Sequence, residues 1–235
     1  MSAPGRMRRS ATKAGLLFLP LGVCGSTAAL AASDTQIWIG NAAVVTLSDR
    51  WRLSEEITTR ISDDKGGLYE IETDTLLGYR LNKFVTVWAG YTFDPQFSKG
   101  EHTATEHRAR EQVAFANVMK LGPGMVSARL RTEQRWRSNA SGTALRVRPF
   151  VRYTIPLDQG GRTGVNFTSE PFFNLNTTSF QSKHGLDRMR NLVAVVTPLG
   201  KNLNGEIGYM NQHIFVSNGP DESDNIAWIS VSATF

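Results

Sequence analysis

The sequence predicts an all-β fold, an antiparallel transmembrane β-barrel of about 10–12 strands. Charged and uncharged residues alternate from Arg129 to Arg137, and the same pattern returns from Arg146 to Arg152. Most candidate strands are long, and short turns alternate with generally longer, more polar loops along the chain. Because successive side chains of a strand point to opposite faces, alternation builds one charged wall and one apolar wall. We expect the charged wall to line the barrel and the apolar wall to face lipid.

The first 31 residues have the layout of a secretory signal peptide. A basic stretch from Arg6 to Lys13 precedes an apolar run from Ala14 to Val23, and Ala29-Leu30-Ala31 resembles a cleavage site. The apolar run is too short to span a membrane as a helix. We therefore expect residues 1–31 to be removed, leaving residues 32–235 as one exported barrel domain.

Removal of this segment changes both the cysteine content and the charge. Cys24 is the one cysteine of the chain, so a thiolate metal site or a cysteine nucleophile is excluded. The segment contains four basic residues and no acidic ones, so 26 Lys and Arg become 22, against 21 Asp and Glu. The basic balance therefore does not indicate nucleic-acid binding, and no motif in the sequence predicts a cofactor or a metal.

Eleven candidate strands follow along the chain. They are residues 36–47, 52–62, 68–79, 84–93, 107–119, 125–138, 144–155, 164–174, 186–196, 203–215 and 225–235. Strands of soluble proteins are usually about five or six residues long, whereas a tilted membrane-crossing strand needs about nine to eleven. The lengths favour a barrel that crosses the outer membrane of a Gram-negative bacterium.

The connections are predicted to be of two kinds. Short turns lie at residues 47–51, 80–83, 120–124 and 199–203, whereas more polar and often longer loops lie at 63–67, 94–106, 138–142, 176–184 and 217–224. Short periplasmic turns and longer extracellular loops are typical of outer-membrane barrels.

The last predicted strand alternates cleanly and places the aromatic Phe235 at its end. This pattern resembles the assembly signal of bacterial outer-membrane barrels, so barrel-assembly machinery is an expected partner. Eleven strands would start the first strand at the extracellular end, whereas bacterial single-chain barrels have an even strand number. Either the first strand is partial, or one strand is missing from the prediction or merged into a loop.

Several motifs together resemble one family. They are Asp34-Thr35-Gln36-Ile37-Trp38, the Trp-Arg-Leu-Ser strand from Trp51, Gly78 to Lys83, His107 to Arg110, the Arg129–Arg137 ladder, Ser169 to Phe173, Leu203 to Tyr209 and the final strand. In this order and spacing the chain resembles the bacterial outer-membrane proteins catalogued as domain of unknown function 2490. The resemblance implies an outer-membrane barrel and no particular activity.

The charged wall defines the candidate functional residues. The predicted basic lumen residues are Arg108, Arg110, Arg129, Arg131, Arg135, Arg137, Arg146, Arg148, Arg152, Arg188 and Arg190. The predicted acidic lumen residues are Glu56, Glu70, Glu72, Asp74, Glu133, Glu170 and Glu206. Buried charges must be paired or hydrated, and arginine grips carboxylates with two parallel hydrogen bonds.

These residues leave two interpretations of the lumen open. A network of salt bridges across the lumen would fill and stiffen a structural barrel. Alternatively, an excess of arginine would line a narrow passage that prefers small anionic solutes. Outer-membrane lipid is the expected partner of the outer wall in both cases.

Two further alternatives belong to different classes. An outer-membrane lipid-modifying enzyme or protease would need a base at the extracellular rim, where His102, His107, His184 and His213 are expected. No catalytic serine motif accompanies them, so we do not predict an enzyme. In a soluble β-protein, the arginine ladder would instead face water and Leu130, Val147 and Val151 would form a core.

Overall fold

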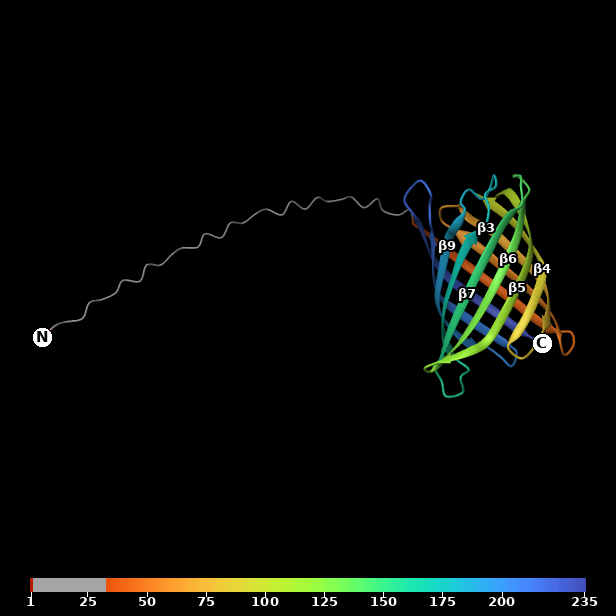
Figure 1. Cartoon of the computed structure of the whole chain (residues 1–235), viewed down its shortest axis with the longest axis vertical. Helices are drawn as coiled ribbons and strands as arrows, with labels where there is room; N and C mark the ends of the chain where they lie inside the picture. Colours follow the sequence, from red (N-terminus) through yellow and green to blue (C-terminus); the bar gives the residue numbers. More distant parts are fainter. Residues whose placement is uncertain (2–32) are drawn as a thin grey trace.

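The computed structural model describes Met1 and residues 33–235, and the latter form a closed barrel of eleven strands (Figure 1). The strands are β1 (Ser33–Thr46), β2 (Trp51–Ser62), β3 (Gly67–Arg80), β4 (Val85–Ser98), β5 (Glu101–Leu121), β6 (Gly124–Arg137), β7 (Ala144–Pro156), β8 (Gly164–Asn174), β9 (Gly185–Pro198), β10 (Leu203–Ile214) and β11 (Glu222–Thr234). The predicted signal peptide, with Cys24, lies outside the described residues, in which no helix is long and apolar enough to span a membrane. The all-β barrel prediction is confirmed.

Most strand boundaries lie within three residues of the predicted ones, with one large exception. The segment predicted as a loop at residues 94–106 is instead the continuation of β4 and β5. Their ladder pairs Asp94 with Glu106 and ends at Ser98 and Glu101. Lys99 and Gly100 form the tight turn between the strands, and both have positive φ angles. The loop prediction was wrong because only Lys99 and Gly100 form the turn, and the residues on either side of them continue the β4–β5 ladder.

The barrel closes through a parallel pair of strands, which explains the odd strand number. β1 is antiparallel to β2 but parallel to β11, in a register that runs from Ser33 opposite Ser223 to Val44 opposite Thr234. Purely antiparallel closure requires an even number of strands, whereas one parallel seam permits an odd number. The first strand therefore does start at the same end of the barrel as the last one. The expectation that it is partial, or that a strand is missing, was wrong.

The last residue extends this seam. The Phe235 N–H donates to the Val44 carbonyl, and the Thr46 N–H donates to the Phe235 carbonyl. The Phe235 side chain itself is exposed.

Side chains alternate between the two faces of the wall. In β1 every second residue from Asp34 to Gly40 is buried and the residues between them are exposed. Exposed apolar side chains continue around the barrel at Ile57, Leu77, Phe93, Leu130, Val151, Val193, Ile207 and Ile229. The inward neighbours are largely polar or charged. An apolar outer surface around a polar interior is the architecture of an outer-membrane β-barrel.

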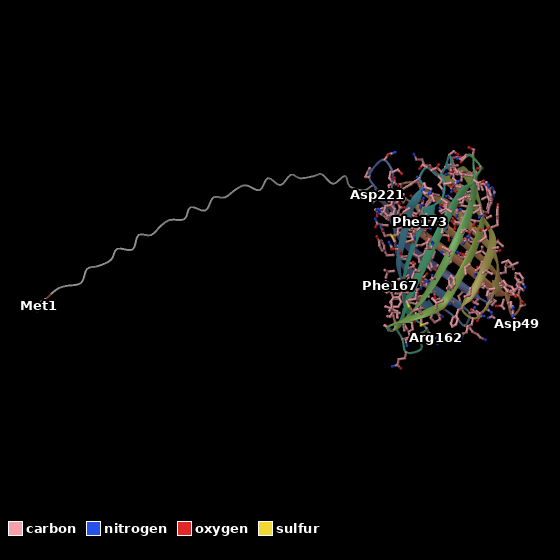
Figure 2. The ribbon with its side chains drawn as sticks, viewed as in Figure 1. Met1, Asp49, Arg162, Phe167, Phe173 and Asp221 are labelled. Atoms are coloured by element: carbon pink, nitrogen blue, oxygen red, sulfur yellow. The ribbon has the colours of Figure 1, made fainter. Side chains whose placement is uncertain are left out.

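The two ends of the barrel carry different connections, with Asp49 and Arg162 at one end and Asp221 at the other (Figure 2). The longest connection, residues 175–184, lies at the Asp221 end. The predicted segregation of short and long connections is incomplete, because residues 157–163 form a longer turn at the Arg162 end. In this turn, the N–H groups of Arg162 and Thr163 donate to the Asp158 carboxylate and hold its pKa below its usual range.

A bulge in β3 brings two consecutive side chains into the barrel. The β2–β3 register shifts so that Arg60 faces Glu70 while Ile61 faces Leu68, leaving Tyr69 as the extra residue. The Tyr69 hydroxyl donates to the buried Gln36 amide oxygen at 2.8 Å. Tyr69 follows Leu68 near a strand end, where an interfacial aromatic would be expected, but it lies inside the barrel.

One side of the lumen is apolar, which the alternation of charges does not predict. Trp38, Leu192, Ala194, Met210 and Ile226 form a buried cluster on β1, β9, β10 and β11. The cluster lies on the seam strands and their neighbours, which also carry charged lumen residues such as Asp34, Arg190 and Asp224.

Candidate functional site

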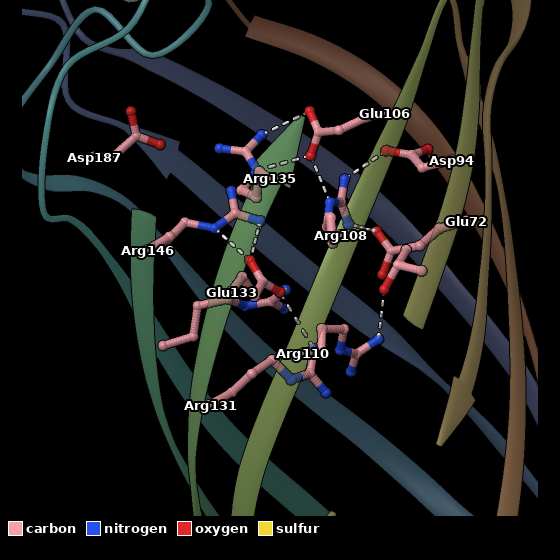
Figure 3. Close-up of polar contacts among 12 residues, drawn as sticks. Glu72, Asp94, Glu106, Arg108, Arg110, Arg131, Glu133, Arg135, Arg146 and Asp187 are labelled. Atoms are coloured by element: carbon pink, nitrogen blue, oxygen red, sulfur yellow. Dashed lines mark hydrogen bonds and ion pairs between the residues drawn. The ribbon is translucent and has the colours of Figure 1, made fainter. Parts of the chain in front are cut away.

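The first part of the charged lumen is centred on Arg108 of β5. Its Nη1 atom lies 2.7 Å from Glu72, its Nε atom lies 2.5 Å from Glu106, and Asp94 contacts Nη2. Figure 3 shows Arg108 between these three carboxylates, which come from β3, β4 and β5. Arg60 of β2 pairs with Glu70 and also with Glu72 at 3.1 Å. Four carboxylates therefore surround two guanidinium groups at the Asp221 end of the barrel.

The second part is centred on Glu133 of β6, whose side chain is fully buried. Arg146 donates from Nε to Glu133 Oε2, and Arg148 donates from Nη1 to Oε1, both at 2.7 Å (Figure 3 shows the Arg146 contact). Arg148 also reaches Glu170 at 3.0 Å, and Arg129 reaches the other oxygen of Glu170 at 2.6 Å. These contacts join β6, β7 and β8 by charge-assisted hydrogen bonds, which are the strong ones.

Arg135 links the network to the longest loop. It grips both oxygens of Glu106, at 2.7 and 2.9 Å, and its Nη1 atom donates to Gln181 at 3.0 Å. Gln181 is buried and also donates to the carbonyl oxygens of Leu145 and Asn176. The 175–184 loop is thereby fastened inside the rim of the barrel.

Several guanidinium groups of the lumen lack a close carboxylate. Within residues 33–235, Arg137, Arg152 and Arg190 form no ion pair within 4.0 Å, and Arg131 reaches Glu133 only at 4.0 Å. The Nε atoms of Arg137 and Arg152 are buried without a hydrogen-bond acceptor in this part of the chain. These cations lie on β6, β7 and β9.

The carboxylates without a cationic partner lie on other strands. Asp34 accepts hydrogen bonds from Gln36 and Ser62. Glu206 accepts hydrogen bonds from Asn166 and Trp228. Asp224 accepts one from Gln212. Glu56 of β2 likewise forms no ion pair within residues 33–235. In this part of the chain the unpaired acids of the lumen therefore lie on β1, β2, β10 and β11, and the unpaired guanidinium groups lie on β6, β7 and β9.

The lumen is less basic than the sequence predicts. Four carboxylates that the prediction placed outside the lumen are buried there, namely Asp34, Asp94, Glu106 and Asp224. Arg60 is also buried there, on the inward face that the alternation of its strand predicts. Each of these acids precedes a predicted strand or lies in a predicted loop. The predicted excess of arginine over carboxylate in the lumen, 11 against 7, falls to 12 against 11, because the strands extend further than predicted. Continuing the alternation through Asp94 and Glu106 could have found two of them.

Three cavities follow one another along the length of the lumen. The upper cavity, of about 400 Å³, reaches Asp64 and Lys65 at one end of the barrel, and the lower one, of about 310 Å³, reaches Phe115 and Ser127 near the other. A middle cavity of about 150 Å³ lies between them. The upper and middle cavities share Trp38, Arg60, Glu72, Arg148 and Arg190, and the middle and lower ones share Glu56, Arg129, Phe150 and Arg152.

The predicted lumen residues lie along these cavities. All of them line at least one cavity except Arg110 and Glu133. Those two are buried in ion pairs, Arg110 with Asp74 and Glu133 with Arg146 and Arg148.

A metal site is not formed by the acidic group at the top of the lumen. Glu70, Glu72 and Asp94 each bring one carboxylate oxygen within 4.8 Å of the others. However, Arg108 contacts all three carboxylates and Arg60 contacts two of them. The guanidinium groups already supply the positive charge that these oxygens require.

The histidines lie apart from any serine hydroxyl. His102 Nε2 lies 2.9 Å from the Thr105 hydroxyl, and His107 contacts Tyr91. His213 Nε2 lies 2.9 Å from Asp221, and the Val216 N–H and this ring hold the pKa of the Asp221 carboxyl below its usual range. No histidine of residues 33–235 forms a hydrogen bond with a serine side chain.

Comparison with known proteins assigns the chain to a family. The pattern described as "Protein of unknown function (DUF2490)" matches residues 35–224, which include nearly the whole barrel. The chain belongs to the DUF2490 family. The resemblance drawn from the sequence motifs is thereby confirmed.

One curated relative and one solved structure are similar to this DUF2490 barrel. An uncharacterized protein of Methylorubrum extorquens is 29% identical over 181 residues, which cover 76% of this chain and 78% of the relative. LpxR from Salmonella typhimurium is 10% identical, with a TM-score of 0.46, covering 77% of this chain and 83% of that chain.

Proposed function

We propose that this DUF2490 barrel spans the outer membrane and forms a narrow, water-filled passage that prefers small anionic solutes. The observation that carries the proposal is the series of three cavities, because neighbouring cavities share lining residues from one end of the barrel to the other. The apolar outer surface supports the location in a bilayer.

Anion preference rests on the two constrictions and not on the total charge of the lumen. Arg60, Arg148 and Arg190 line the constriction between the upper and middle cavities. Arg60 and Arg148 each pair with two carboxylates, so the uncompensated positive charge at this point is that of Arg190. Arg129, Arg152 and Glu56 line the constriction between the middle and lower cavities. Arg129 pairs with Glu170, whereas Arg152 forms no ion pair within residues 33–235. Arginine that lines a narrow passage favours anions, so the unpaired guanidinium group at each constriction selects the same sign of charge.

Conductance in a planar lipid bilayer tests this proposal. We expect a small conductance with an anion-to-cation permeability ratio above one. The Arg152→Glu variant should lower that ratio, because it reverses one charge at the second constriction. The matched control is Arg162→Glu, since Arg162 lies exposed in the 157–163 turn. A folded barrel without conductance above background would instead be a structural barrel sealed by its ion pairs.

A further inference from the structure

Arg190 of β9 lies at the junction of the upper and middle cavities and is held rigidly there. Its Nε atom donates to the Gln212 amide oxygen at 2.7 Å. The guanidinium carbon lies 4.5 Å from the Trp38 ring centre and 4.7 Å from the Phe172 ring centre. Both rings attract the cation through their faces, so the orientation of the guanidinium group is fixed before any ligand arrives.

The positive charge of Arg190 is not neutralised by the described chain. No carboxylate of residues 33–235 lies within 4.0 Å of it. The nearby Asp224 is bound by the Gln212 side-chain amide at 2.6 Å. By contrast, Arg60 lies over the Trp38 ring and Arg148 lies over the Phe172 ring, and each of these two arginines pairs with two carboxylates.

The guanidinium group of Arg188, two residues before Arg190 on β9, also lies near the Phe172 ring. Arg188 lies 5.9 Å from the Phe172 ring centre and pairs only with the adjacent Asp187, through its Nε atom. Arg188 and Arg190 both line the upper cavity of about 400 Å³. Their terminal nitrogen atoms form no hydrogen bond within residues 33–235.

We infer that Arg190, assisted by Arg188, forms a binding site for a phosphate group in the upper cavity. A guanidinium group presents a planar fork of donors that matches phosphate oxygens in pairs. An entering anion would also compensate a half-buried cation that has no counterion within residues 33–235, which is otherwise costly. The group can be inorganic phosphate or the end of a small phosphomonoester, because the upper cavity is larger than one phosphate requires.

This inference rests on the proposed passage only for the route by which the anion enters. Isothermal titration calorimetry on the folded barrel in detergent measures binding without any transport. Titration with inorganic phosphate and with glycerol 3-phosphate distinguishes the two sources of the group. We expect saturable binding of at least one, and an Arg190→Gln variant that weakens it about tenfold or more, as loss of a charge-assisted hydrogen bond predicts.

Two controls separate recognition from folding. Arg190→Lys retains the charge without the fork and should bind with intermediate affinity, whereas Arg162→Gln should bind like the parent protein. Circular dichroism verifies that each variant keeps its β-barrel.

Two outcomes contradict the inference: no saturable heat with either ligand, or binding that Arg190→Gln leaves unchanged. Saturable binding in a barrel that conducts no ions would leave the site intact and contradict only the passage.

Discussion

Glu133 shows how a single residue organises the charged interior. Its side chain is fully buried and accepts hydrogen bonds from Arg146 and Arg148, which both come from the neighbouring strand β7. A buried ion pair contributes little net stability compared with an apolar pair, yet removal of one partner leaves an uncompensated charge. At Glu133, two guanidinium groups would lose their shared carboxylate.

We predict that Glu133→Gln lowers the free energy of unfolding by about 3–5 kcal/mol, the usual cost of breaking a buried ion pair. Urea unfolding of the barrel in lipid vesicles, followed by tryptophan fluorescence, measures the effect. Glu101→Gln is the matched control, because Glu101 is exposed at the start of β5. If the free energy of unfolding fell by the same small amount in both variants, the ion pairs of Glu133 would not be important for the stability of the barrel.

The side chains on the outward face of each strand are mostly apolar, as a lipid environment requires. Leu130 of β6 is 47% exposed, although its inward neighbours Arg129 and Arg131 take part in the lumen network. The outward rows are interrupted by Glu55 and Glu111, whose carboxylates accept hydrogen bonds from neighbouring hydroxyl or amide groups. Exposed leucine beside buried arginine is costly in water and is suited to a lipid surface.

We predict that Leu130→Arg destabilises the barrel in vesicles by about 2–4 kcal/mol, the cost of an arginine near the middle of a bilayer. The control is Leu81→Arg, because Leu81 lies exposed in the turn between β3 and β4. Unfolding in urea after assembly into vesicles provides the measurement. Equal stability of the Leu130→Arg and parent barrels would indicate that this surface contacts water.

The molecule as a whole depends on the seam between β1 and β11. Twelve aligned residue pairs join the two strands in parallel, and the apolar lumen cluster of Trp38, Leu192, Ala194, Met210 and Ile226 packs beside them. The seam sets the odd strand number and places the first residues of β1 at the same end as the start of β11. Trp38 already faces Arg60 across the β1–β2 ladder, and the seam brings Arg190 of β9 beside the same ring, so closure completes the first constriction.

We predict that cysteines introduced at Ile39 and Ile229 form a disulfide, because these residues are direct partners across the seam. A mobility shift on a non-reducing gel after mild oxidation detects the bond. The control pair is Ile37→Cys with Ile229→Cys, which is displaced by two residues along the strand. Efficient bonding in the control pair alone would contradict the parallel register.

Local alternation made most strands and their faces predictable. Charged residues alternate with uncharged ones in the segments Arg129–Arg137 and Arg146–Arg152. The inward orientation of these arginines can therefore be predicted from each segment alone. Asp94 and Glu106 were missed because turn-like residues between them imitate a loop. The sequence does not predict that Tyr69 faces the lumen, because a bulge depends on the register of two strands and one strand alone does not encode it.

The order of residues is therefore sufficient to define a chain of long alternating strands with one charged and one apolar wall. Ladder partners, the parallel closure and the neutralisation of individual charges depend on residues far apart in the chain. Only the folded barrel shows that Glu133 pairs with Arg146 and Arg148, while Arg190 has no carboxylate within 4.0 Å among residues 33–235. The reason is that alternation acts between neighbours in sequence, whereas an ion pair across a lumen acts between neighbours in space.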